Sequence, residues 1–189
     1  VRIAKIRFTG NKSISASDLR DQMETQAESW ISFLDDSGIY NKDTLRLDIF
    51  RLEGYYHDKG YIRVQISDPK IDINKKDKQI NIIVVIEEGP KFRVGKVTVQ
   101  SDETLTEKQI FQVIKTKKKE VYSVSRVRED ILSVTELYSQ RGYAYADINP
   151  ITKINDDSRT VDLNIEIDKG RKVYVGEISV VGNTRTLDN

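Results

Sequence analysis

Neither the types nor the spacing of the polar side chains in this chain supports catalysis or metal binding. There is no cysteine and one histidine, His57, so thiol nucleophiles, disulfides and zinc–thiolate sites are excluded. The acidic pairs at 35–36 and 156–157 lack the alternating ligand spacing of a calcium loop, and we interpret them as turn residues. No glycine-rich nucleotide loop or hydrolase motif occurs. We therefore expect neither cofactor nor metal.

The charge is nearly balanced, with 31 Lys and Arg against 30 Asp and Glu. Tyrosines near Arg63 could stack on single-stranded nucleic acid, which makes an RNA-binding αβ module an alternative. Balanced charge argues against it, and we expect no nucleic-acid partner. No apolar run has the length of a membrane helix. Because Val1 already lies in a strand-like pattern, we expect a fragment of a longer protein.

The sequence repeats with an offset of about 82 residues. The stretch 56–62, Tyr-His-Asp-Lys-Gly-Tyr-Ile, returns at 138–144 as Tyr-Ser-Gln-Arg-Gly-Tyr-Ala. In each copy we expect a helix to end at the glycine, Gly60 or Gly142, because glycine adopts the left-handed φ that follows a helix. Strand-like alternation of apolar residues begins three copies, at 3–11, 94–102 and 175–183.

Helix signals lie between the first strand and the glycine. Ser15 and Thr106 are good N-caps, and Gln109 completes a capping box with Thr106. A second helix is predicted from apolar residues at i, i+4, i+7 and i+11 in both copies. These residues are Leu45, Ile49, Leu52 and Tyr56, then Val127, Ile131, Val134 and Tyr138.

Two strands close each copy, the first over about 61–74 and about 143–155, the second over 80–86 and 161–167. The order β-α-α-β-β predicts an α+β fold, with a small three-stranded mixed sheet covered on one face by two helices. We expect one domain over residues 1–89, another over 90–170, and the first strand of a third over 171–189.

Proline falls inside both second strands, at Pro69 and Pro150. Because proline has no N–H for a sheet ladder, these strands should be at sheet edges, where the residues before the proline could pair with another strand. The prolines could instead prevent such pairing, and both interpretations stay open. The predicted binding residues are Tyr61, Ile62, Arg63, Val64, Gln65, Ile66 and Ser67, then Tyr143, Ala144, Tyr145 and Ala146.

The first copy also carries about nine extra residues around 29–38. Trp30, Phe33 and Leu34 make this insert apolar and aromatic. It is interpreted either as a helix extension packed on its own domain or as a contact with a neighbouring unit or partner, since aromatic anchors are typical of interfaces.

Taken in order, these features resemble POTRA domains, the polypeptide-transport-associated domains of the Omp85 superfamily. The resemblance rests on the β-α-α-β-β order, the Gly10-Asn11 turn after the first strand and the Tyr-x-x-x-Gly-Tyr helix end, and it covers the whole chain. The Trp30 insert, the Tyr143-Ala144-Tyr145 segment and the ending at 182–186 look like the third and fourth domains of a five-domain BamA-type assembly factor and the start of the fifth.

The resemblance implies a place and a role. Such arrays lie in the periplasm as part of an outer-membrane protein, continuous with a C-terminal membrane β-barrel. They receive unfolded outer-membrane proteins and dock accessory lipoproteins. They catalyse no reaction, so the resemblance implies that this protein is not an enzyme. Binding of clients would then occur by β-augmentation at the predicted edges. The alternative is another Omp85-type translocation factor whose array is mainly a rigid spacer and docking platform.

Overall fold

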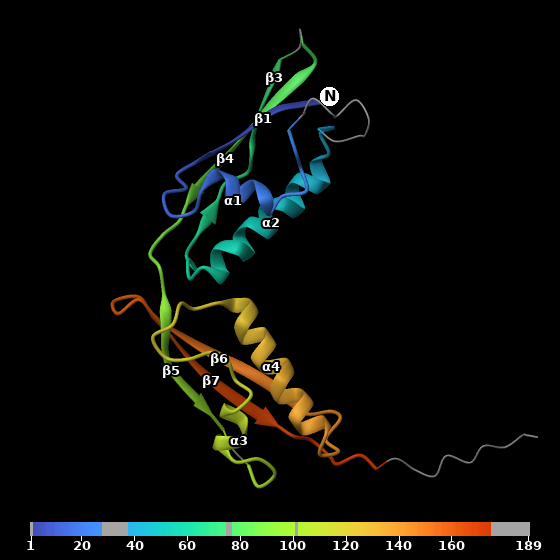
Figure 1. Cartoon of the computed structure of the whole chain (residues 1–189), viewed down its shortest axis with the longest axis vertical. Coiled ribbons are helices and arrows are strands. Elements are labelled where there is room, and N and C mark those ends of the chain that lie inside the picture. The colour runs from blue at the N-terminus through green and yellow to red at the C-terminus, as the bar shows by residue number, and fades with distance from the viewer. Residues whose placement is uncertain (1, 28–37, 75–76, 101, 175–189) are drawn as a thin grey trace, which may run out of the picture.

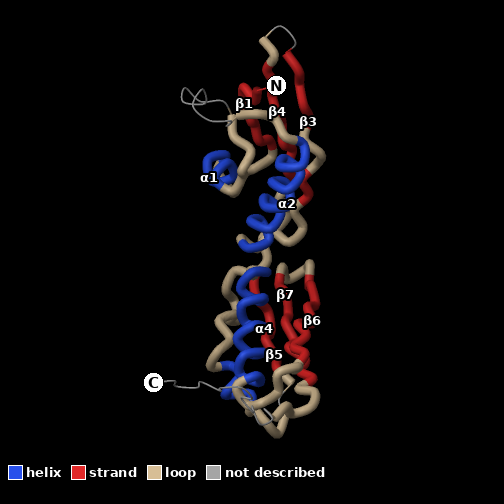
Figure 2. The backbone as a smooth tube through the Cα atoms, turned by 90° about the vertical axis from the view of Figure 1, so that its right-hand side faces the viewer, coloured by secondary structure: helices blue, strands red, loops and turns tan. Residues whose placement is uncertain are grey.

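The computed structural model describes residues 2–27, 38–74, 77–100 and 102–174 as two units stacked end to end (Figure 1). Each unit is a small sheet with helices on one face (Figure 2), which confirms the predicted α+β class. The first unit contains β1 (Arg2–Thr9), α1 (Ala16–Asp21), α2 (Lys42–Asp58), β2 (Gln65–Ile66), β3 (Lys70–Asn74) and β4 (Gln79–Glu87). The second contains β5 (Arg93–Val99), α3 (Glu107–Phe111), α4 (Val124–Ser139), β6 (Asp147–Asn155) and β7 (Thr160–Asp168).

The last strand of each unit is the central one. β4 pairs in parallel with β1 and antiparallel with β2 and β3. In the second unit, β7 pairs in parallel with β5 and antiparallel with β6. The mixed sheets and the edge position of each second strand are therefore as predicted.

The second strand of the first unit is not continuous, and the prediction of one strand over 61–74 is wrong. The register pairs Gln65 with Glu87 but Lys70 with Ile83. The outer strand therefore advances by five residues where β4 advances by four. The extra residue is accommodated at Asp68-Pro69, between β2 and β3. Proline cannot donate to the ladder, and the chain bulges there.

The predicted starts of both second strands are also wrong. Residues 61–64 and 143–146 form turns. Tyr61 N donates to Tyr56 O at 2.9 Å, and Tyr143 N donates to Tyr138 O at 3.0 Å, so each tyrosine closes the helix end before it. The backbone therefore turns for several residues before it can enter the sheet.

Local signals at the helix ends are confirmed. Ser15 and Thr106 are N-caps, and Thr106 forms the full capping box with Gln109. Gly60 and Gly142 have φ of 91° and 89°. Each unit has its own hydrophobic core, which contains buried stripe residues of α2 or α4 together with buried residues of the central strand.

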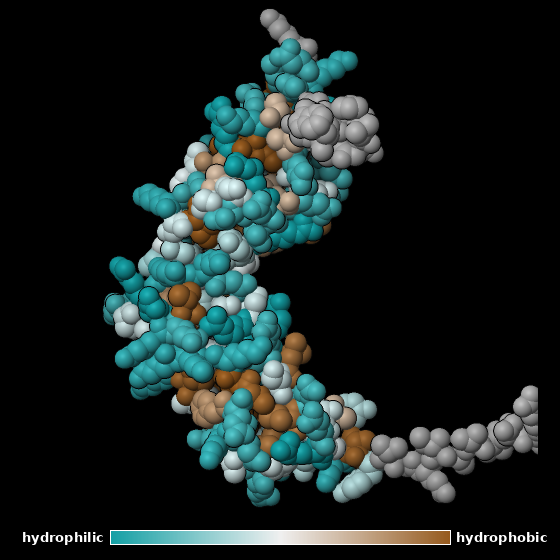
Figure 3. All heavy atoms as spheres, in the orientation of Figure 1, coloured by the Kyte–Doolittle hydropathy of each residue, from teal (hydrophilic) through white to brown (hydrophobic). Residues whose placement is uncertain are grey.

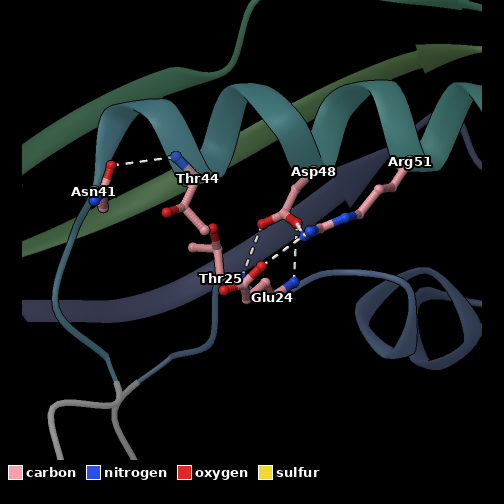
Figure 4. A network of polar contacts seen from close by, with 6 residues as sticks. All are labelled: Glu24, Thr25, Asn41, Thr44, Asp48 and Arg51. Atoms are coloured by element: carbon pink, nitrogen blue, oxygen red, sulfur yellow. Dashed lines mark hydrogen bonds and ion pairs between the residues drawn. The ribbon is translucent and has the colours of Figure 1, made fainter. Parts of the chain in front are cut away.

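Two buried carboxylates were not predicted. Asp48 in α2 and Asp130 in α4 are both 0% exposed, and they are separated by the repeat offset. Asp130 accepts hydrogen bonds from Lys115 N at 2.7 Å and Thr116 N at 3.0 Å. Asp48 likewise accepts hydrogen bonds from the backbone N–H groups of Glu24 and Thr25 (Figure 4). In each unit, a helical aspartate therefore holds the segment that follows the first helix.

Candidate functional site

The outer strand of the first sheet leaves backbone groups unpaired on one side. Ser67 N donates to Val85 O at 3.0 Å. Because successive residues of a strand direct their N–H and C=O groups to opposite sides, odd-numbered residues of β4 face β2 and β3. Ile66, Ile71 and Ile73 are opposite even-numbered β4 residues, so their backbone groups point to the free edge.

The second sheet has the same design. Gln100 N donates to Ile165 O, so odd-numbered residues of β7 face β5. Pro150 is opposite Ile165, so the backbone nitrogen and carbonyl of Pro150 point to the free edge. Its missing N–H costs the sheet no hydrogen bond, which is why proline is tolerated within this strand. Ile148, Thr152 and Ile154 also direct their backbone groups to this edge.

A groove of about 590 Å³ runs along the free edge of the first unit, between α2 and the outer strand. Phe50 from α2 and Ile71 from β3 line it and are 58% and 38% exposed. Ile73, on the same side of the strand, is 59% exposed. A strand added along this edge would cover apolar side chains as well as complete backbone hydrogen bonds. The face of the molecule that Figure 3 draws has separate hydrophobic patches within a mostly hydrophilic surface.

The predicted first-edge residues have several roles in the structure. Only Gln65, Ile66 and Ser67 lie in or directly after β2, and Ser67 N is already bonded. Tyr61 is 9% exposed and packs edge-to-face on Tyr56, with ring centroids 5.8 Å apart. Val64 packs partly against the first core.

The predicted second-edge residues precede β6. Tyr143 is half-buried, with Lys169 Nζ 5.6 Å from its ring centroid. Tyr145 is 80% exposed, whereas Ala146 packs partly against the second core. Like Tyr143 and Tyr145, Ala144 lies outside the strand. The predicted contact residues Trp30, Phe33 and Leu34 lie outside the described residues.

Sequence analysis thus identified the edge strands, but the structure places residues 61–64 and 143–146 in turns before those strands. Most residues whose backbone faces the free edge lie after the first proline or around the second, and sequence analysis did not single them out. The signal was the alternation Lys70-Ile71-Asp72-Ile73-Asn74, in which isoleucines alternate with polar residues.

Polar contacts join the two units. Asp58, the last residue of α2, accepts from Ser125 N at 2.8 Å, Ser125 Oγ at 2.6 Å and Ser123 Oγ at 3.0 Å at the start of α4. Phe92 N donates to Gly60 O at 2.8 Å, and Tyr122 N donates to Phe92 O at 3.2 Å. The end of one long helix therefore caps the beginning of the other.

A second contact lies at the outer-strand side of this joint. Arg63 donates from Nε and Nη2 to the Asp156 carboxylate, with Nη2 3.0 Å from Oδ2. Ile62, one residue earlier, packs against the core of the second unit. Both residues are among those predicted to bind a partner strand, and in the structure they lie at the contact between the units.

Acidification should weaken the joint through Asp58. Burial acts to raise the pKa of Asp58, but hydrogen bonds from Ser125 and Ser123 outweigh it, so the folded-state pKa is lowered. Its stabilising contribution is then complete above the ordinary carboxyl pKa and is lost as pH falls through the lowered value. We expect Asp58→Asn to lose about 1–2 kcal/mol at pH 7, since partial exposure screens the charge.

Urea unfolding of the wild type and Asp58→Asn between pH 7 and pH 2.5 measures the difference in their unfolding free energies. This difference should shrink in acid as the Asp58 carboxyl of the wild type is protonated. A difference of the same size at every pH would show that the charge of Asp58 is not what stabilises the joint.

Comparison with known proteins gives the family. The POTRA family model, described as a surface antigen variable number repeat, matches residues 1–89 and 92–170. The chain belongs to the POTRA family. Within the part of the chain that the structure describes, no helix is long and apolar enough to span a membrane, and no cluster of acidic residues and histidine could hold a metal ion.

Relatives of this POTRA chain include two proteins named outer membrane protein assembly factor BamA. The protein from Nitratidesulfovibrio vulgaris is 26% identical over 191 residues, and that from Neisseria meningitidis serogroup B is 29% identical over 189 residues. Each match covers 99% of this chain and 24% of the relative, so the chain spans about a quarter of their length.

Solved structures agree on the fold. Domains POTRA3-5 of Haemophilus influenzae BamA superpose with a TM-score of 0.71 at 21% identity, covering 99% of this chain and 73% of that one. BamA of Haemophilus ducreyi lacking POTRA domains 1-3 gives 0.64 at 17% identity, covering 88% and 29%. The chain is therefore a run of POTRA domains of a BamA-like Omp85-superfamily protein, in the periplasmic portion of an outer-membrane protein.

Proposed function

We propose that these POTRA units receive unfolded outer-membrane proteins during β-barrel assembly, by β-augmentation at the free sheet edges. The observation that carries this function is the first edge, where the backbone groups of Ile66, Ile71 and Ile73 are directed away from the sheet beside an apolar groove. A strand of any sequence could form backbone hydrogen bonds with this edge, and its alternate side chains would lie in the groove.

Three free-edge positions allow roughly six hydrogen bonds in an antiparallel pair, because each such position exchanges two. At about 1 kcal/mol net for each bond, less the cost of ordering the peptide, binding is weak and reversible. Clients that must move on to a membrane require such binding. No reaction is assigned to the chain.

Within the full-length protein, we place these units as the third and fourth POTRA domains, over 1–89 and 90–170, with 171–189 beginning the next. The array would continue into a C-terminal membrane β-barrel. Accessory lipoproteins would dock on it, with the 29–38 insert as a candidate contact. The alternative, a rigid spacer and docking array, is favoured by the polar joint at Asp58.

The test of the client site is Ile73→Pro. This change removes an N–H from the free edge but none from the β3–β4 ladder. The control Ile73→Thr keeps the N–H and the β-branched shape. A ten-residue peptide with alternating valine and threonine is titrated while amide chemical shifts are recorded.

We expect wild-type shifts along both free edges, at residues 66–74 and 148–154, with millimolar affinity. Affinity measured from the shifts at residues 66–74 should fall at least fivefold in Ile73→Pro and less than twofold in Ile73→Thr, while the shifts at 148–154 persist. Shifts confined to the helices would reject β-augmentation, and the absence of binding at either edge would favour the spacer alternative.

A further inference from the structure

The free edges of the two units lie along the same side of the molecule (Figure 2). They also meet end to end. β6 ends at Asn155, and the next residue, Asp156, is paired with Arg63, two residues before β2 begins. β6 therefore runs toward the joint and β2–β3 runs away from it, so both edges have the same chain direction.

This shared direction has a stereochemical consequence. A single extended polypeptide that is antiparallel to β3 is also antiparallel to β6, without reversing its direction. At about 3.3 Å per residue, each edge is roughly 30 Å long. A segment of roughly 20–25 residues is long enough to cover both edges and the joint.

The two edges are also alike in the side chains that they offer. On the first edge, the positions whose backbone faces outward are Ile66, Ile71 and Ile73. On the second they include Ile148, which is buried, and Ile154, which is 39% exposed. They are opposite the buried or half-buried β7 residues Ile167 and Val161. All five side chains lie on the helix-covered side of their sheet, so both edges fit a strand with apolar residues at alternate positions.

The joint holds the edges in place. Asp58 joins the two long helices through Ser123 and Ser125, and Arg63 pairs with Asp156 beside the edges. Fixed spacing matters because two weak sites act together only where their geometry allows simultaneous binding.

We propose that the two units form one composite binding edge, which captures a single extended client segment of alternating apolar and polar residues across both sheets. This composite edge rests on the proposed function, since it requires that each edge bind a strand. It adds that binding is bivalent, and that the client segment must be long enough to span both edges and the joint.

The probe is a 25-residue peptide in which two alternating valine–threonine segments of nine residues are joined by a seven-residue Gly-Ser linker. Its matched control has the second segment replaced by glycine and serine. Both are titrated by fluorescence anisotropy against the whole chain and against two edge-blocked variants. The blocked variants are Ile73→Pro and Thr152→Pro, each of which removes an N–H only from a free edge. Circular dichroism checks that both remain folded.

We expect the tandem peptide to bind wild-type protein at least tenfold more tightly than the single-segment control. Either blocked variant should reduce the tandem peptide to the affinity of the control, while the control still binds both variants. Arg63→Ala combined with Asp58→Ala should reduce the tandem gain and leave control binding unchanged.

Equal affinity of tandem and control peptides for the wild type, with control binding preserved in both variants, would overturn the composite edge and leave the proposed function standing. The composite edge would also be overturned if the tandem peptide still bound Thr152→Pro more tightly than the control peptide does, because β6 would then not take part. If neither peptide binds any protein, the proposed function fails together with the composite edge.

Discussion

Replacing Asp48 with alanine should destabilise the first unit by about 3 kcal/mol. Asp48 is fully buried and accepts from Glu24 N at 2.9 Å and Thr25 N at 2.8 Å. Its third partner is Arg51, with Nη1 2.7 Å from Oδ1 (Figure 4). Alanine leaves two backbone N–H groups without an acceptor, and each buried unpaired group costs about 1–3 kcal/mol.

Asp43→Ala is the matched control for Asp48→Ala. Asp43 lies in the same helix but is exposed in its first turn, so it contributes only about 0.3–1 kcal/mol through the helix dipole. Urea unfolding followed by circular dichroism measures both variants. Equal losses in the two variants would mean that Asp48 acts through general helix stability and not through the segment at 24–25.

The Asp48 contribution should also depend on pH. Burial acts to raise the pKa of Asp48, but hydrogen bonds from Thr25, Glu24 and Arg51 outweigh it and lower the pKa. The stabilisation is therefore present above the ordinary carboxyl pKa and is lost as pH falls through the lowered folded-state value. The difference in unfolding free energy between wild type and Asp48→Ala should therefore become smaller as the pH falls.

Gly60→Ala is expected to cost about 2–4 kcal/mol and to disturb the joint. Gly60 has φ of +91°, and a Cβ there would lie 2.7 Å from Phe92 O. A side chain costs about 1–2 kcal/mol in a left-handed conformation, and the backbone contact adds to this. Because Phe92 O accepts from Tyr122 N, movement at Gly60 reaches the second unit.

Two other glycines distinguish the cost of the left-handed conformation from the cost of the contact with Phe92. Gly142 has nearly the same φ, +89°, but an added Cβ would first meet the flexible Lys172 side chain at 3.2 Å. Gly142→Ala should therefore cost only about 1–2 kcal/mol. Gly54 is in α2 with nothing within 4 Å of an added Cβ, so Gly54→Ala should stabilise by up to about 1 kcal/mol.

Thermal and urea unfolding rank the three alanine variants. Amide shifts at Tyr122 to Ser125 report on the joint and should move in Gly60→Ala alone. Equal costs at Gly60 and Gly142 would show that backbone strain, and not the approach of Phe92, makes glycine necessary at the joint.

The amino-acid sequence alone determined the local features of this protein. Caps such as Thr106 with Gln109, the apolar stripes of the long helices and the turns at Gly60 and Gly142 depend on residues a few positions apart. Such interactions can be predicted from spacing. The repeat then predicted the order of elements and, through Pro69 and Pro150, which strand lies at each edge.

Tertiary structure decided how those edges are used. Tyr61 enters the core, Ile62 packs on the next unit and Arg63 pairs with Asp156, so three predicted edge residues serve other purposes. The role of Asp48 and the direction of the Ile71 backbone likewise depend on partners far along the chain. The physical reason is that strand register and buried polar pairing are set by non-local contacts, which neither periodicity nor propensity specifies.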